Sequence, residues 1–158
     1  MAGTGRRTLP TKEQLRIWRD YIETAELVGR LLGARLQNDT GLSSGDYTVL
    51  LALSEAKGHR QRSSELAEQI GWERSRLSHH LGRMEKRGLI RRDACADDSR
   101  GAEVVLSEDG ARAFHASTVP HLRAVRETFV DAYDAEQLAR IDTLTTTLRT
   151  HLGLAPRG

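Results

Sequence analysis

The residues of this sequence best suited to chemistry form a cationic, helix-like stretch at residues 70–92. It holds seven arginines or lysines against two glutamates, in a chain whose formal net charge is only +2. Leu77, Leu81 and Met84 recur at helical spacing, which predicts one apolar face packed against a core. The opposite face carries guanidinium, imidazole and hydroxyl groups, which can bind phosphates and base edges. We interpret the stretch as a DNA recognition helix and expect its contacts to be Arg74, Ser75, Arg76, Ser78, His79 and Arg83.

The preceding segment distinguishes this stretch from an ordinary solvated helix face, which is the commoner meaning of such a charge pattern. Residues 63–70 predict a short helix with a serine cap, an acidic first turn and a stop at Gly71. Two helices joined by a short glycine-containing turn form a helix-turn-helix, whose second helix enters the major groove. We therefore add Ser63 and Ser64 to the expected DNA contacts and expect Trp72, in the turn, to plug the core.

A polar turn between two strand-like segments follows the recognition helix. Residues 89–92 and 103–106 predict strands, and residues 96–101 between them contain the turn formers Asp, Ser and Gly. Together they predict a two-stranded wing. Arg100 in this turn suits the narrow, electronegative minor groove, and Asp98 can brace its guanidinium. Cys95 lies among aspartates that disfavour a thiolate, so we expect it to be a bystander.

Capping signals mark two further helices. Ser43 or Ser44 caps a helix that is expected to run to Gly58 and to pack behind the helix-turn-helix. After the wing, Ser107 caps a longer helix, in which Pro120 predicts a kink.

The two ends of the chain also carry helical patterns. Residues 11–40 predict a helix that is apolar around much of its girth and so needs partners on two sides. Asp134 and Gln137 resemble a capping box at the start of the last helix. That helix has a narrow apolar stripe, typical of a seam between helices. The stripe consists of Leu138, Ile141, Leu144, Leu148 and Leu152.

In this order, these motifs resemble the MarR family of winged helix-turn-helix transcription regulators, over residues 15–152. The most specific pieces are Ser-Glu-Leu-Ala at residues 64–67 and Arg-Met-Glu-Lys-Arg-Gly-Leu-Ile at residues 83–90. The wing sequence Asp-Ser-Arg-Gly at 98–101 and Leu-Ser-Glu-Asp-Gly at 106–110 complete the match. Gly82 departs from the commonest pattern, since glycine inside a helix costs about 1 kcal/mol relative to alanine.

The resemblance implies a mostly α (α+β) fold in which a winged helix-turn-helix lies between dimerisation helices. The expected parts are a disordered basic tail at 1–10, a helical dimerisation region at 11–40 and 107–153, and a DNA-binding domain at 41–106. It assigns the stripe of the last helix to a twofold dimer interface. It also implies a ligand-responsive repressor that binds a pseudo-palindromic operator in double-stranded DNA as a homodimer. Effectors in the family are often small anionic aromatic compounds, for which Trp18, Tyr21 and Tyr47 could line a crevice or simply form core.

Catalytic and metal chemistry find little support in the sequence. His79 and His80 are adjacent and point about 100° apart on a helix, so they cannot share a metal without strain. His80 is expected to pack at the edge of the core. No serine–histidine–aspartate pattern, phosphate-binding glycine loop or paired-carboxylate motif is present, so we expect no enzyme, metal or cofactor. The competing reading is a winged helix that binds another protein, or one that binds DNA architecturally without a target sequence.

Length and composition agree with a small helical protein. At 158 residues with 4% aromatic residues, the chain suits one unit built by aliphatic helix packing. A single cysteine is typical of a reducing compartment, and no stretch reaches about 18 consecutive apolar residues. We therefore expect a cytoplasmic protein that does not enter a membrane.

Overall fold

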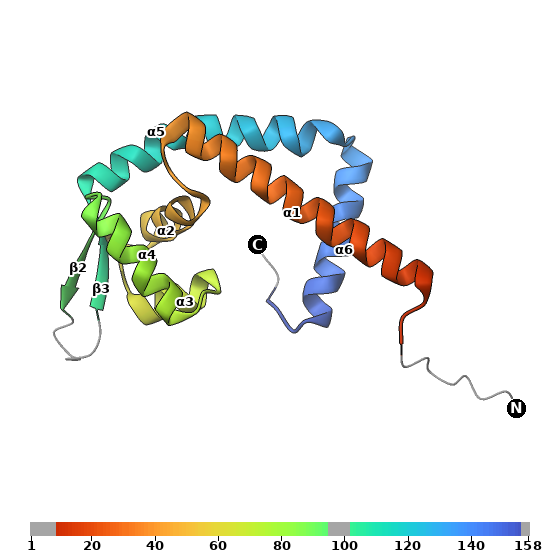
Figure 1. Ribbon diagram of the computed structural model, residues 1–158, viewed down its shortest axis with the longest axis horizontal. Coiled ribbons are helices and arrows are strands. Elements are labelled where there is room, and N and C mark those ends of the chain that lie inside the picture. Colours follow the sequence, from red (N-terminus) through yellow and green to blue (C-terminus); the bar gives the residue numbers. More distant parts are fainter. Residues whose placement is uncertain (1–8, 95–101, 156–158) are drawn as a thin grey trace, which may run out of the picture.

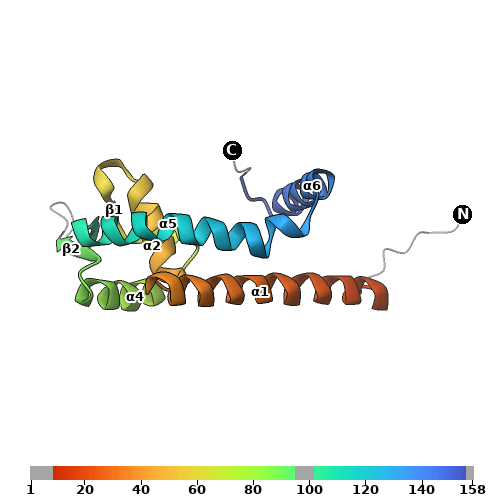
Figure 2. The same cartoon turned by 90° about the horizontal axis from the view of Figure 1, so that it is seen from above.

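A computed structural model describes residues 9–94 and 102–155, and it divides into a helical frame and a smaller lobe. The frame consists of α1 (Lys12–Thr40), α5 (Glu108–Thr128) and α6 (Ala135–His151). The lobe consists of α2 (Ser44–Glu55), α3 (Ser63–Ile70), α4 (Arg74–Lys86) and a three-stranded sheet. Helices α1 and α5 run side by side, the lobe lies near one end of this pair, and α6 turns away at the other end (Figures 1 and 2).

The core lies in the lobe. Helices α2, α3 and α4 each direct an apolar face into it, and the central strand closes it from the side. The most buried side chains include Leu50, Leu53, Leu66, Leu77, Leu81, Met84 and Val104. The apolar spacing of residues 77, 81 and 84 is therefore confirmed as a buried face, and this packing fixes which side of α4 is exposed.

The sheet has one strand more than the sequence predicts. β3 (Ala102–Leu106) lies in the centre, with β2 (Ile90–Ala94) on one side and β1 (Arg60–Arg62) on the other, all antiparallel. The pairing of β2 with β3 agrees with the expected wing strands. Strand β1 is the tripeptide Arg-Gln-Arg, which has no strand-forming pattern, and it is extended because it pairs with the open edge of β3.

The predicted serine caps of α2 and α5 are confirmed, and the serine cap predicted for α3 is wrong. Ser43 caps α2 in a capping box with Asp46, and Ser107 caps α5 by accepting a hydrogen bond from the Gly110 amide. The serine cap of α3 is a wrong prediction, because Arg62 holds the N-cap position and no described side chain caps this helix. Pairing of residues 60–62 in β1 already sets the chain direction there, so Ser63 falls inside the helix.

Other helix boundaries differ only slightly from expectation. α1 ends at Gly41, which adopts the left-handed conformation, and Asp134 with Gln137 forms the expected capping box of α6. α2 stops at Glu55 rather than at Gly58, because a short 3₁₀ turn, η1 (Lys57–His59), leads into β1. A second 3₁₀ turn, η2 (Val130–Ala132), joins α5 to α6, and α5 continues through Pro120 as one helix.

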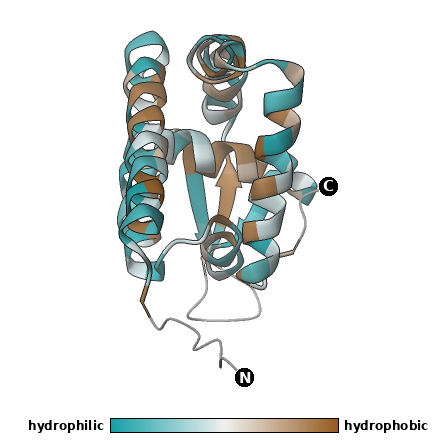
Figure 3. Ribbon diagram, turned by 90° about the vertical axis from the view of Figure 1, so that its right-hand side faces the viewer, coloured by the Kyte–Doolittle hydropathy of each residue, from teal (hydrophilic) through white to brown (hydrophobic). Residues whose placement is uncertain are grey.

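The helical frame is far less buried than the lobe. Leu36 is the only buried residue within α1, and no residue of α6 is buried by the described part of the chain. Figure 3 shows α1 and α6 on opposite sides of the view, both with apolar segments. None of the helices that the structure describes has both the length and the apolar character needed to cross a membrane.

Candidate nucleic-acid interface

The expected recognition residues share the exposed side of α4. Leu77, His80, Leu81 and Met84 are its buried residues. The six expected contacts on this helix are all exposed: Arg74, Ser75, Arg76, Ser78, His79 and Arg83. Ser63 and Ser64 lie at the start of the neighbouring α3, where Ser63 is half-buried and Ser64 is exposed. Hydroxyl groups are therefore accessible on both helices, and α4 adds exposed guanidinium groups.

Three of the seven cations in and directly after α4 are paired with carboxylates, so they contribute less positive charge to a ligand. Arg91 binds Asp93 at 2.7 Å and Arg92 binds Glu85 at 2.7 Å, while Arg87 binds Asp46. Four cations of α4 have no acidic partner within residues 9–94 and 102–155: Arg74, Arg76, Arg83 and Lys86. All four lie on the exposed part of the helix, so unbalanced positive charge concentrates there.

Trp72 positions one of these arginines. Its ring belongs to the edge of the lobe's core and meets the His80 ring edge-on, with 5.3 Å between centroids. The guanidinium carbon of Arg76 lies 4.2 Å from the Trp72 ring centroid, a cation–π contact. The expected core plug is confirmed, and the sequence reasoning missed its second contact. The spacing of the two residues, with the tryptophan just before the helix and the arginine four residues later, could have indicated this contact.

A buried polar network holds Arg83 on the next turn of α4. Arg83 Nη2 lies 2.9 Å from Nδ1 of His80, and His80 Nε2 lies 3.0 Å from Oδ1 of Asp46. Arg87 Nη1 donates to Oδ2 of Asp46 at 2.7 Å, and Arg87 Nη2 donates to the Gly41 carbonyl at 3.0 Å. The network thus joins α4 to the start of α2 and the end of α1. These groups, with Gln37 and Ser43, line a small cavity of about 410 Å³.

The protonation states of this network follow from burial and partners. Burial alone would raise the pKa of Asp46, but hydrogen bonds from Arg87 and Ser43 outweigh it and hold that pKa below its ordinary value. Burial lowers the pKa of His80, and the nearby Arg83 and Arg87 charges add to this effect against the opposing Asp46. Asp46 is therefore ionised and His80 neutral at pH 7.

The remaining site residues of the sequence analysis lie elsewhere. Asp98, Arg100 and Cys95 fall outside the described residues, although β2 and β3, which flank them, are in place. Within the described residues, no group of three His, Cys, Asp or Glu side chains could hold a metal ion.

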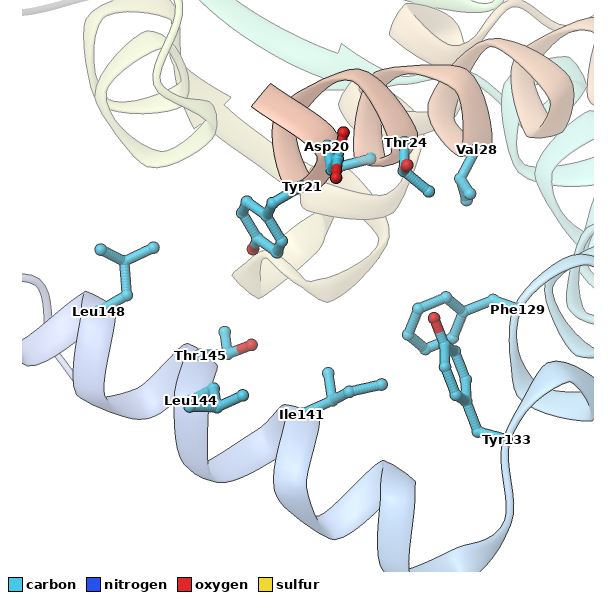
Figure 4. A pocket seen from close by; sticks show the side chains of 11 residues that line it. Asp20, Tyr21, Thr24, Val28, Phe129, Tyr133, Ile141, Leu144, Thr145 and Leu148 are labelled. Atoms are coloured by element: carbon cyan, nitrogen blue, oxygen red, sulfur yellow. The ribbon is translucent and has the colours of Figure 1, made fainter. Parts of the chain in front are cut away.

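The apolar stripe of α6 points toward α1 across a cavity of about 670 Å³ (Figure 4). Leu138 and Ile141 are half-buried, whereas Leu144, Leu148 and Leu152 are exposed by 69%, 45% and 60%. The cavity is lined by Tyr21 and Val28 from α1, by Phe129 and Tyr133 near the α5–α6 connection, and by Ile141, Leu144 and Leu148 from α6, among others. A single protomer therefore leaves much of this stripe uncovered.

The three aromatic residues expected near an effector lie in two different parts of the described structure, Trp18 and Tyr21 on α1 and Tyr47 on α2. Tyr21 lines the cavity between α1 and α6, Trp18 is 58% exposed and is not among that cavity's lining residues, and Tyr47 belongs to the lobe. The Tyr47 ring lies 4.4 Å from the His121 ring and 5.3 Å from the Phe114 ring, both on α5.

Comparison with known proteins identifies this arrangement of lobe and frame. The family model described as "MarR family" matches residues 42–101. The transcriptional regulator HosA of Escherichia coli is 32% identical over 105 residues, which cover 66% of this chain and 76% of HosA. Among solved structures, AbsC, a MarR family transcriptional regulator from Streptomyces coelicolor, is 35% identical with a TM-score of 0.81, over 91% of this chain and 97% of AbsC. Sco3205, a MarR family regulator of the same organism solved in complex with DNA, is 34% identical with a TM-score of 0.83, over 94% of this chain and 92% of Sco3205.

The class of protein is therefore a winged helix-turn-helix transcriptional regulator. The chain belongs to the MarR family, as its motifs predict.

Proposed function

We propose that this protein binds a pseudo-palindromic operator as a homodimer, with α4 of each protomer in the major groove, and acts as an effector-responsive repressor. The observation that carries the proposal is the group of four cationic side chains on the exposed side of α4 that have no acidic partner within the described residues. Since its target would be chromosomal DNA, the proposal places the protein in the cytoplasm. Relatives solved with DNA, such as Sco3205, support it.

The residue types on α4 favour DNA over a protein partner. A protein-binding face is typically rich in aromatic and aliphatic side chains. Within Arg74–Lys86, the exposed residues are instead arginines, serines, a histidine and a lysine at the end of the helix. None of them is apolar or acidic. Arg76 and Arg83 can each donate two hydrogen bonds to a guanine, while Ser63 and Ser64 can reach phosphates from the start of α3. Asp98 and Arg100 are proposed to add a minor-groove contact from the wing.

The arginine contacts give the first prediction. Arg76→Ala and Arg83→Ala should each weaken binding to the operator by about 1 to 3 kcal/mol, with a smaller loss on unrelated DNA. Fluorescence anisotropy with a labelled operator and a scrambled duplex measures both affinities. Arg140→Ala is the matched control, since Arg140 is exposed on α6 and pairs only with Glu136 among the described residues. Wild-type operator affinity in both α4 variants would show that α4 does not read the DNA.

A second copy of the chain is the proposed partner of α1 and α6. A single helix-turn-helix makes too few contacts for tight and selective binding, whereas a twofold dimer sets two recognition helices about 34 Å apart. The apolar side chains exposed on both helices agree with such an interface. On α1 they include Leu15, Ile17, Trp18, Tyr21 and Leu31. On α6 they are Leu144, Leu148 and Leu152, with the half-buried Leu138 and Ile141 beside them.

The dimer interface gives the second prediction. Leu148→Asp should raise the dimer dissociation constant at least about 100-fold, because it would bury a carboxylate without a partner. Sedimentation equilibrium of wild type and variant measures this constant. Thr146→Asp adds the same charge on the side of α6 away from the cavity lining and should leave the constant nearly unchanged. A Leu148→Asp protein as dimeric as wild type would remove α6 from the interface.

Release by an effector is the last part of the proposal. Tyr47 and His121 form an aromatic pair where α2 meets α5, and the buried Nδ1 of His121 has no hydrogen-bond partner among the described residues. A small anionic aromatic compound could supply one. Titration of benzoate-type compounds into the DNA complex tests this part, since a complex that none of them dissociates would argue against it.

A further inference from the structure

The contact between Arg83 and His80 constrains the proton on the histidine ring. Arginine carries only hydrogen-bond donors, so Nδ1 of His80, 2.9 Å from Arg83 Nη2, must accept. In the neutral ring the proton then resides on Nε2, which faces the Asp46 carboxylate at 3.0 Å. His80 Nε2 makes no hydrogen bond among the described residues, so Asp46 favours a proton on this nitrogen through its negative charge, and this is the tautomer that can hold Arg83.

The rest of the network makes this arrangement rigid. Asp46 is 2% exposed and His80 is 9% exposed, so neither side chain can turn to solvent without opening the lobe. Asp46 is held by the Ser43 amide at 2.9 Å and by Arg87 at 2.7 Å. The His80 ring is packed against Trp72, and a Cβ on Gly45 would lie 2.8 Å from the ring's Cε1. By contrast, Arg83 itself is exposed and depends on this acceptor for its placement.

We infer that Asp46 and His80 are positioning residues that aim Arg83 at DNA, and that protonation of His80 releases Arg83 and lowers sequence discrimination. This rests on the proposed function, since it needs Arg83 to contact DNA. With both ring nitrogens protonated, His80 has no acceptor left, and an N–H would face the Arg83 guanidinium. The Arg83 guanidinium is then no longer held in one orientation, and the site gains one positive charge. Affinity for any DNA therefore rises or holds, and the preference for the operator falls.

The acidity at which this happens is set by every charged group that faces His80. From α2, Asp46 stabilises the protonated ring, whereas Arg83 on α4 and Arg87 at its end oppose protonation. Burial opposes it further, so the pKa of His80 lies below its ordinary value of 6.5. Arg83 is therefore held at neutral pH and released only in acid.

The test compares operator and scrambled-duplex affinities of the full-length protein, by fluorescence anisotropy from pH 7.5 to pH 5.5. In wild type the ratio of operator affinity to scrambled-duplex affinity should fall as the pH is lowered, approaching about a tenfold loss when His80 is fully protonated, which is the discrimination carried by one arginine–base contact. Because His79 is itself an expected DNA contact, His80→Gln is compared in a His79→Gln background. There it should give a flat pH profile, because glutamine cannot titrate and still offers an amide oxygen and an amide N–H. In the Arg83→Ala background, His80→Gln should change the ratio no further, since two residues that act through one contact are not additive. His115→Gln, an exposed histidine of α5, is the control and should keep the wild-type profile.

A merely structural His80 would change thermal stability without changing these profiles. Circular dichroism at each pH therefore accompanies the binding data. A direct check that needs no variant is ¹⁵N NMR of the imidazole in wild type, which should show the proton on Nε2 of His80 at pH 7.5. A proton on Nδ1, a pH dependence that persists when both His79 and His80 are glutamine, or additive effects of His80→Gln and Arg83→Ala would each overturn the inference. If Arg83→Ala matched wild type at pH 7.5, the proposed DNA contact itself would be wrong, which is a separate outcome.

Discussion

Replacing Gly110 with alanine is expected to lower the free energy of unfolding by about 3 kcal/mol. A Cβ at this position would lie 2.0 Å from the Leu89 carbonyl oxygen and 2.9 Å from its carbon. That carbonyl accepts a hydrogen bond from the Ser107 amide, and the Ser107 hydroxyl bonds the Gly88 carbonyl at 2.5 Å. The clash is therefore between two backbones that are tied together, and only a shift of α5 away from β2 could relieve it.

Gly82→Ala is the matched control, with the opposite expected sign. No described atom lies within 4 Å of a Cβ at Gly82, so alanine should add about 1 kcal/mol by its helix propensity. Urea denaturation of both variants at one protein concentration measures the two changes. A Gly110→Ala protein as stable as wild type, or a destabilised Gly82→Ala protein, would contradict the packing described for these two helices.

Asp46→Ala should cost about 2 to 3 kcal/mol, because it removes the common partner of three groups. The substitution leaves the half-exposed Arg87 without its carboxylate, removes the contact to buried His80, and deletes half of the capping box of α2. Asp39→Ala is the comparison: Asp39 is an exposed carboxylate 3.9 Å from Arg35, and its loss should change stability by less than about 0.5 kcal/mol. Equal urea midpoints for the two variants would show that the network does not stabilise the lobe.

The same network predicts how stability depends on pH. The pKa of His80 is lowered mainly by burial, so the unfolded chain binds a proton more readily than the folded one. The contribution of neutral His80 is complete above its ordinary value of 6.5 and is lost as the pH falls below that value. Asp46, whose pKa is lowered by Arg87 and Ser43 against the effect of burial, contributes fully above 3.8 and loses its contribution in stronger acid. Urea midpoints should therefore fall on acidification from pH 7 to pH 5, less steeply in His80→Gln; a rise over this range would contradict the assignment.

Short-range patterns were enough to predict most of the fold. The spacing of Leu77, Leu81 and Met84 and the stop at Gly71 identify the helix-turn-helix, because helical period and glycine caps act within a few residues. The cap of α5 by Ser107 could be predicted from the sequence in the same way. The sequence Leu-Ser-Glu-Asp-Gly was recognised as a motif, but the reason for its glycine, the close approach of Leu89, needs the tertiary structure.

Contacts between distant segments could not be predicted in this way. Asp46 and Arg87 are 41 residues apart, and no short-range pattern in the sequence links them. Strand β1 follows from the free edge of β3 and not from the tripeptide at 60–62, and this pairing also made the serine cap of α3 a wrong prediction. The separation of Trp18, Tyr21 and Tyr47 likewise depends on how α1 leaves the lobe, which residue types do not encode.

Selection of genomic DNA by the purified protein tests most directly whether two copies of α4 read one operator. Fragments retained by wild type should share a pseudo-palindrome whose half-sites are centred about one helical turn apart, and the DNA upstream of the protein's own gene is the first candidate to contain it. A protein carrying both Arg76→Ala and Arg83→Ala should no longer enrich that sequence. Retention of fragments with no shared sequence, or of the same palindrome by the double variant, would contradict the account.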